Sequence, residues 1–155
     1  MAPGDIGAIA ELEGRCFEEP WPSLAFEQFA GADGFLIAVD TSISKVDHPG
    51  LPDGRLAGYV VTTPASDGHT NVHVRNLAVA PERRRRGLGS RLLIASLRQY
   101  QEQGFDRARL EVRHSNRGAI DLYRGHDFEI VGREPHYYGD GEDAVIMARP
   151  LAALH

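Results

Sequence analysis

The sequence predicts a single α+β domain in which helices flank a central mixed, mostly antiparallel β-sheet. The chain has 155 residues, a length that suits one hydrophobic core, and 42% of them are apolar, as in a folded domain. Helical and extended patterns are interleaved along the chain in the order α–α–β–β–β–α–β–α–β–β. No internal repeat or low-complexity tract is visible, so we expect residues 1–155 to form one domain.

The first half of the chain predicts two helices and three strands. Asp5 is the expected N-cap of the first helix. A second short helix is expected over 21–29, where Pro22 is tolerated near the start. The turn-rich segment 41–54 predicts a surface loop or a long hairpin. The first helix is predicted from residues at helical spacing: Ile6, Ile9, Ala10, Glu13, Cys16 and Phe17. Strands are expected at 35–40, 55–63 and 70–80.

The second half predicts two helices that alternate with strands. Apolar residues at helical spacing predict a helix over 88–103, which Gly104 ends. Good capping residues open a shorter helix within 115–127. A polar and aromatic loop is expected at 135–142, between the last two strands. Strands are expected at 107–113, 128–134 and 143–149.

Composition and charge exclude several classes of protein. The net charge is −5, whereas a general nucleic-acid binder carries a basic balance. No apolar run approaches the roughly 18 residues of a membrane helix, and the first residues do not resemble an export signal. The single cysteine, Cys16, fits a reducing compartment. We therefore expect a cytoplasmic protein without nucleic-acid or membrane partners; the sequence does not distinguish a monomer from a homodimer.

The stretch NLAVAPERRRRGLGSRLL, residues 76–93, is the most informative part of the chain. It lacks the Walker pattern, and it does not complete the dinucleotide pattern, because Leu92 stands where the third glycine belongs. What remains is a strand, a turn with Gly87 and Gly89, and a helix. Glycines allow close backbone approach, and a helix N-terminus with nearby arginines binds phosphate groups. Without further context, a solvated basic turn is the alternative.

Two segments together resemble the GNAT N-acetyltransferase superfamily, and more closely its RimI-type N-terminal protein acetyltransferases. The first is R-x-x-G-x-G, beginning at Arg84 after NLAVAP. The second, LEVRHSNRGAIDLY, follows about 20 residues later and is more specific than the glycines alone. The resemblance runs from about residue 70 to 149. CFEEPWPSLAFEQF is also similar to the first helix–loop–helix of that family.

The resemblance implies acetyl-CoA as donor, with Glu111 as general base and Tyr123 as general acid. Trp21, Tyr137 and Tyr138 would surround an incoming peptide. The cofactor contacts implied by the resemblance are Leu77, Ala78, Val79, Arg84, Arg85, Arg86, Gly87, Leu88, Gly89, Ser90 and Asn116.

The chain departs from the family in two places. Asp127 stands where the family usually has a glycine before the phenylalanine. We expect aspartate to tolerate the left-handed backbone of that helix end. The segment 41–54 also looks longer than usual, which could alter access of the substrate.

The chemistry is consistent with these residue types. An amine must be neutral to attack a thioester, and at pH 7 the neutral fraction is roughly 14% for an α-amine but roughly 0.04% for lysine. A carboxylate such as Glu111 can take the proton, a phenol such as Tyr123 can protonate the leaving thiolate, and a backbone N–H near Val79 can bind the oxyanion. No metal is required, and His69 and His73 lie on an expected strand pattern that does not favour a metal site.

Each proposed site residue also has a purely structural interpretation. Glu111 could form the polar face of a strand, and Tyr123 could be a packing aromatic. Trp21 could close the core end of the first helix, while Tyr137 and Tyr138 could be ordinary loop aromatics. Three functions therefore stay open: acetylation of protein N-termini such as those of ribosomal proteins, acetylation of a small amine or lysine, and CoA or RNA binding without catalysis.

Overall fold

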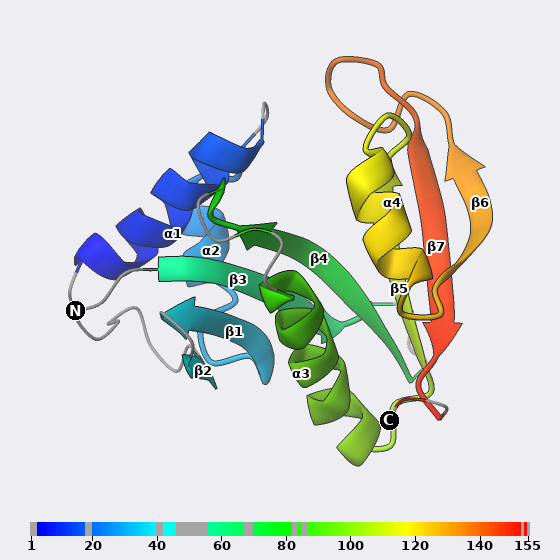
Figure 1. The fold of residues 1–155 in the computed structure, drawn as a ribbon, viewed down its shortest axis with the longest axis horizontal. Coiled ribbons are helices and arrows are strands. Elements are labelled where there is room, and N and C mark those ends of the chain that lie inside the picture. Colours follow the sequence, from blue (N-terminus) through cyan, green and yellow to red (C-terminus); the bar gives the residue numbers. More distant parts are fainter. Residues whose placement is uncertain are drawn as a thin grey trace.

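The computed structural model of the chain describes residues 3–17, 20–39, 42–45, 56–66, 70–81, 84, 87–152 and 154. Within these ranges, seven strands form one sheet in the order β2-β1-β3-β4-β5-β7-β6 (Figure 1). The strands are β1 (Gly34–Val39), β2 (Ser42–Lys45), β3 (Leu56–Pro64), β4 (Asn71–Val79), β5 (Arg107–Arg113), β6 (Glu129–Glu134) and β7 (Ala144–Pro150). The helices are α1 (Pro3–Cys16), α2 (Ser23–Glu27), α3 (Leu88–Glu102) and α4 (Arg117–Arg124).

Neighbouring strands are antiparallel except β4 and β5, which are parallel. The predicted fold class, a mixed and mostly antiparallel sheet flanked by helices, is confirmed. One boundary prediction is wrong: α1 already begins at Pro3, so Asp5 lies inside the helix and is not its N-cap. Part of the predicted loop or hairpin at 41–54 is a strand, since β2 pairs antiparallel with β1, while 41 and 46–54 lie outside the described residues.

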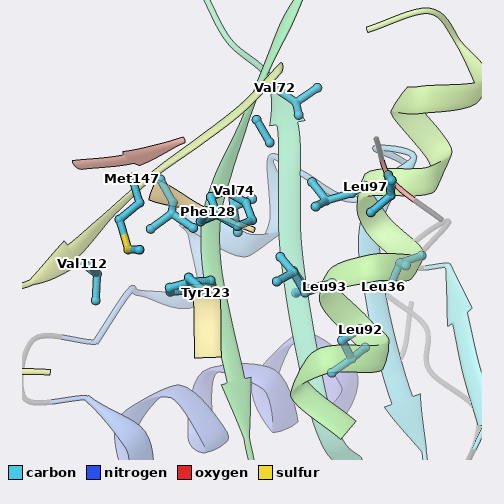
Figure 2. Close-up of a cluster of buried hydrophobic side chains, with 14 of the residues drawn as sticks. Leu36, Val72, Val74, Leu92, Leu93, Leu97, Val112, Tyr123, Phe128 and Met147 are labelled. Atoms are coloured by element: carbon cyan, nitrogen blue, oxygen red, sulfur yellow. The ribbon is translucent and has the colours of Figure 1, made fainter. Parts of the chain in front are cut away.

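Two hydrophobic clusters hold the helices to the sheet. The larger contains buried leucines of α3 together with Tyr123 of α4 and Phe128. Figure 2 shows it, with Leu92, Leu93 and Leu97 on one side and Tyr123 and Phe128 on the other. The smaller cluster joins α1 and α2 to β1, β3 and the end of β4. The sheet is therefore packed on both faces at β1, β3 and the end of β4, which fixes the position of these strands.

A β-bulge in β4 changes the direction of its side chains. Val61 of β3 pairs with Asn76 and the next residue pairs with Val74, so Arg75 is an extra residue in β4. Val74 belongs to the larger cluster before the bulge, and Leu77 packs against that same cluster after it. Because side chains alternate along a strand, one extra residue reverses the faces. Asn76 therefore points to the side of α1.

The parallel pairing of β4 with β5 is short. It extends from Asn71 with Arg107 to Val74 with Leu110 and stops at the bulge. Beyond that point, β4 continues to Val79 and β5 to Arg113 without pairing to each other. In Figure 1, β4 runs toward α1 while the β5–β7 half of the sheet lies beside α4. The two central strands therefore separate at their carboxyl ends.

Among the described residues, the helices are too short or too polar to cross a membrane.

Candidate active site

Two cavities lie where β4 and β5 separate. One has a volume of about 750 Å³ and reaches the start of α3. The other, of about 400 Å³, lies between α1, β5 and the loop after β6. Both are lined by the same group of residues at their meeting point: Phe17, Leu77, Asn116, Ala119 and Tyr123. A molecule in the larger cavity can therefore meet a molecule in the smaller one beside Tyr123.

The larger cavity ends at a helix N-terminus with an unusual backbone. Gly87, the N-cap of α3, has φ 72° and ψ 11°, a left-handed conformation that favours glycine. The first backbone N–H groups of α3 have no partner within the helix, and the helix dipole makes this end positive. A Cβ added at Gly89 would meet the Val79 side chain at an ordinary van der Waals distance of 3.5 Å. This end of the cavity suits a phosphate-bearing ligand.

The backbone of β4 forms another wall of the larger cavity. The N–H of Ala80 donates to Ala57 in β3 at 2.8 Å, so the alternating groups of Leu77 and Val79 point away from β3. The Val79 carbonyl accepts a hydrogen bond from Nε of Arg84 at 3.1 Å. Backbone N–H and C=O groups that do not pair with a neighbouring strand are suited to bind an amide-bearing ligand.

Most predicted cofactor contacts line this cavity. They are Leu77, Ala78, Val79, Arg84, Gly87, Leu88, Gly89, Ser90 and Asn116. Arg85 and Arg86, which were predicted with them, lie outside the described residues. A long cavity with an anion-binding end and a backbone wall fits the shape and chemistry of acetyl-CoA.

Tyr123 lies on α4, which Asn116 caps by accepting a hydrogen bond from the Ala119 N–H at 3.1 Å. The Tyr123 ring packs edge-on against Phe128, with ring centres 5.7 Å apart. Burial, and secondarily the nearby Tyr138, raise the pKa of Tyr123, so its proton stays in place at neutral pH. The phenol at the junction of the cavities is therefore protonated at neutral pH.

The end of α4 keeps the backbone shape expected from the family. Asp127 has φ 65°, in the left-handed region, and the following Phe128 N–H donates to the Tyr123 carbonyl at 3.1 Å. The expectation that aspartate replaces the usual glycine here is confirmed. The departure from the family pattern therefore leaves Tyr123 packed in the core.

Glu111 of β5 provides a carboxylate in the smaller cavity. One of its oxygens is hydrogen-bonded to Nε2 of His73, and the other lies 3.6 Å from Nε of Arg109. Burial raises the pKa of Glu111, but the hydrogen bond and charge of His73, with Arg109 and Arg75, outweigh burial and lower it. The Glu111 side chain is only 14% exposed, yet its carboxylate is ionised at neutral pH.

Aromatic rings form the outer walls of the smaller cavity. Trp21 packs against Phe26, with ring centres 5.3 Å apart. Tyr137 and Tyr138 contact each other edge-on at 5.1 Å, and the Arg113 guanidinium lies 4.1 Å from the Tyr138 ring centre. The structure therefore brings Trp21 together with both tyrosines around the cavity that holds Glu111.

Residues 6–128 match the acetyltransferase (GNAT) family. The chain belongs to this family. An N-alpha-acetyltransferase from Saccharolobus solfataricus is 45% identical over 151 residues, which cover 95% of the chain and 88% of that protein. The ribosomal protein bS18-alanine N-acetyltransferase of Escherichia coli (strain K12) is 32% identical over 151 residues, covering 96% and 93%.

The three-dimensional comparison agrees. The crystal structure of the ribosomal-protein-S18-alanine N-acetyltransferase from Escherichia coli has a TM-score of 0.74 at 29% identity, covering 97% of the chain and 90% of that structure. The chain spans 39% to 65% of the length of the first curated relatives that it matches. The resemblance to the GNAT superfamily and its RimI-type members is confirmed.

Two polar residues of this GNAT domain were not among the predicted site residues. His73 was considered only as a partner of His69, which lies outside the described residues; its partner is Glu111, on a strand that the sequence does not show to be adjacent. Glu13 is 1% exposed and its carboxylate lines the smaller cavity. Its only signal in the sequence is a charge on the inward stripe of the first helix.

Proposed function

We propose that this GNAT protein transfers the acetyl group of acetyl-CoA to the α-amine of a protein or peptide N-terminus. The observation that carries the proposal is the meeting of two cavities at Tyr123, one suited to a phosphate-bearing ligand and the other containing an ionised carboxylate. Residues 1–155 would act as one domain. The N-alpha-acetylating relatives support the choice of acceptor.

Acetyl-CoA would supply the acetyl thioester from the larger cavity. The first N–H groups of α3 and Arg84 would hold its pyrophosphate, together with Arg85 and Arg86, which the sequence resemblance assigns to the same group. The backbone of β4 from Leu77 to Val79 would hold the amide-bearing arm. One of these N–H groups would also bind the oxygen on which negative charge develops during transfer.

The acceptor amine would enter through the smaller cavity. Glu111, directly or through a water molecule, would take the proton that the amine loses on attack. Tyr123 would donate its proton to the departing sulfur, a role that its position at the junction and its protonated state at neutral pH support. Trp21, Tyr137 and Tyr138 would hold the peptide in an extended line toward Glu111.

The test uses acetyl-CoA with two short peptides of matched sequence. One has a free N-terminal alanine, the acceptor named for the Escherichia coli relative, and no lysine. The other is blocked at its N-terminus and carries one internal lysine. We expect acetylation of the free α-amine, located by mass spectrometry, to be much faster. Tyr138→Ala should raise the peptide KM and leave acetyl-CoA binding unchanged.

Acetylation mainly of the lysine peptide would overturn this proposal. Turnover of polyamines or aminoglycosides without turnover of peptides would instead favour a small-molecule acceptor. Acetyl-CoA binding without turnover of any amine would leave a CoA-binding protein without catalysis.

A further inference from the structure

Glu13 is a buried carboxylate with no role in the chemistry proposed above. It lies on α1, is 1% exposed, and lines the acceptor cavity. Oε1 accepts hydrogen bonds from the Tyr59 hydroxyl at 2.7 Å and from Nδ2 of Asn76 at 2.8 Å. Oε2 accepts from Nδ2 of Asn76 at 2.7 Å and from the Trp21 backbone N–H at 3.1 Å. One carboxylate therefore ties α1 to β3, to β4 and to the segment before α2.

These contacts leave Glu13 poorly suited to act as a base. A carboxylate has about four acceptor positions, and the contacts with Tyr59, Asn76 and Trp21 occupy that number. All the donors are neutral, and burial raises the pKa of Glu13 while the hydrogen bonds partly offset that rise. Glu111 differs, because its partners His73 and Arg109 are basic side chains. The two carboxylates of one cavity are therefore held in different ways.

The orientation of Asn76 follows from Glu13. Because the amide nitrogen of Asn76 faces the carboxylate, its Oδ1 faces the Leu77 N–H, at 3.1 Å. Leu77 lines both cavities, next to the point where they meet. An N–H donor at position 13 would face the Nδ2 donor of Asn76, and two donors cannot bond to each other. The Asn76 side chain would then favour the flipped orientation, in which Oδ1 faces position 13. Glu13 thus acts on the junction through Asn76 and on the aromatic wall through Trp21.

We propose that Glu13 is a positioning residue of the acceptor site, fixing both the Trp21 segment and the Asn76 amide before the acceptor binds. The proposal rests on the proposed function, since it assigns the smaller cavity to the acceptor. A site whose walls are already ordered binds its ligand without a further entropic cost. Loss of the carboxylate should therefore affect the acceptor and spare acetyl-CoA.

The first experiment is Glu13→Gln, which keeps the shape but replaces one acceptor by a donor. We expect the peptide KM to rise about tenfold, because small misplacements at a reacting site are costly, with the acetyl-CoA KM within about twofold of wild type. Tyr59→Phe is the matched control. It removes one donor to Glu13 but leaves Asn76 and Trp21 in place, so its peptide KM should stay within about twofold. Equal changes in both KM values for Glu13→Gln would contradict the proposal.

The second experiment exchanges the two side chains. In Glu13→Gln with Asn76→Asp, the amide nitrogen at 13 takes the place of Oε1 and donates to the carboxylate at 76 and to the Tyr59 hydroxyl oxygen, while the amide oxygen takes the place of Oε2 and still accepts from the Trp21 N–H. We expect the peptide KM of this double variant to return most of the way to the wild-type value, although each single change raises it. A double-mutant cycle measures this coupling. If Glu13→Gln does not fold, the exchanged pair is compared with Asn76→Asp alone. No recovery would show that the network does not set the acceptor site.

The third measurement does not depend on catalysis. Trp21 is the only tryptophan of the chain, so its fluorescence reports on this segment alone. Glu13→Gln should shift the emission maximum to longer wavelength, Tyr59→Phe should leave it near wild type, and the exchanged pair should restore it. Unchanged emission in Glu13→Gln would overturn the positioning role even if the protein acetylates peptides. A shifted emission without peptide turnover by wild type would instead count against the proposed function.

Discussion

The two cavities of the site are built in different ways. The larger one is lined by short stretches of sequence at the end of β4, at the start of α3 around Gly87 and Gly89, and on α4. The smaller one is formed by side chains from α1, β4, β5 and the loop after β6, and its charges are balanced by contacts between these elements. A site made of short local stretches leaves a motif in the sequence, whereas a site made of paired charges becomes visible only once the strands are placed.

The largest expected effect concerns the larger cavity, which the proposal assigns to acetyl-CoA. Gly89→Glu places a negative charge and a long side chain at the start of α3, where an anion should bind. We expect the rise in Tm that acetyl-CoA causes in the wild type to disappear, measured by thermal unfolding with and without ligand. Gly14→Glu, the same change at an exposed position with no atom within 4 Å of the added Cβ, should keep that rise. If acetyl-CoA still raises the Tm of Gly89→Glu as it does for the wild type, the pyrophosphate does not bind at the start of α3.

The next effect concerns the junction of the cavities. Tyr123→Phe should lower the single-turnover rate of acetyl transfer roughly 10²-fold while acetyl-CoA still binds, because the proton donor to the leaving sulfur is lost. Tyr100→Phe is the control: it also removes a buried hydroxyl, one bonded to Gly34 and Thr62, and should lower Tm without changing the rate. A wild-type rate in Tyr123→Phe excludes this residue from proton transfer.

A smaller effect tests the charge balance of the acceptor cavity by pH. Because the pKa of Glu111 is lowered, its carboxylate stays ionised below neutrality, and the rate on peptides should rise with pH through the ionisation of the α-amine, at about 7.8. His73→Ala removes the hydrogen bond that lowers the pKa, while burial still raises it. We expect the limb that reports Glu111, which lies at more acidic pH than the amine limb, to move to higher pH in that variant, while the amine limb at about 7.8 stays in place. If the more acidic limb does not move, Glu111 is not the titrating base.

The smallest effect concerns the hydrogen bonds of Glu142, in the loop after β6 that also carries Tyr137 and Tyr138. Hydrogen bonds from Ser115 and Arg113 lower the pKa of Glu142 to about 2. Its contribution to stability is therefore complete above the ordinary glutamate pKa of about 4.3 and is lost as pH falls toward about 2. Glu142→Gln should lower Tm slightly at pH 7, and the difference from wild type should close over that acidic range. A difference that persists at the lowest pH would assign the effect to packing.

Hydrophobic periodicity and turn residues were sufficient to predict the four helices and six of the seven strands that the structure describes; β2 lies in the segment expected as a loop or long hairpin. The helix after Gly87 and the left-handed end of α4 at Asp127 were predicted because short local rules govern both. The start of α1 was misplaced, since Asp5 has the residue type of a cap but the helix continues to Pro3. Helix ends depend on balances that a single capping residue does not decide.

The charge network of the smaller cavity could not be predicted in the same way. The pairing of His73 with Glu111 depends on β4 lying parallel to β5, 38 residues later in the chain. The buried position of Glu13 depends on three partners that come from separate segments. Such contacts are set by tertiary structure, which local patterns do not encode.

The extra residue in β4 determines where this strand can lose a residue in evolution. Removing Arg75 would restore regular alternation, so Asn76 and Ala78 would stay on the side of α1, and Leu77 and Val79 on the side of α3 and α4. Removing a residue after the bulge would instead turn every later residue of the strand to the opposite face and exchange the cavity walls that this part of β4 forms. The length of β4 after the bulge is therefore inherited under stricter selection than the bulge residue itself.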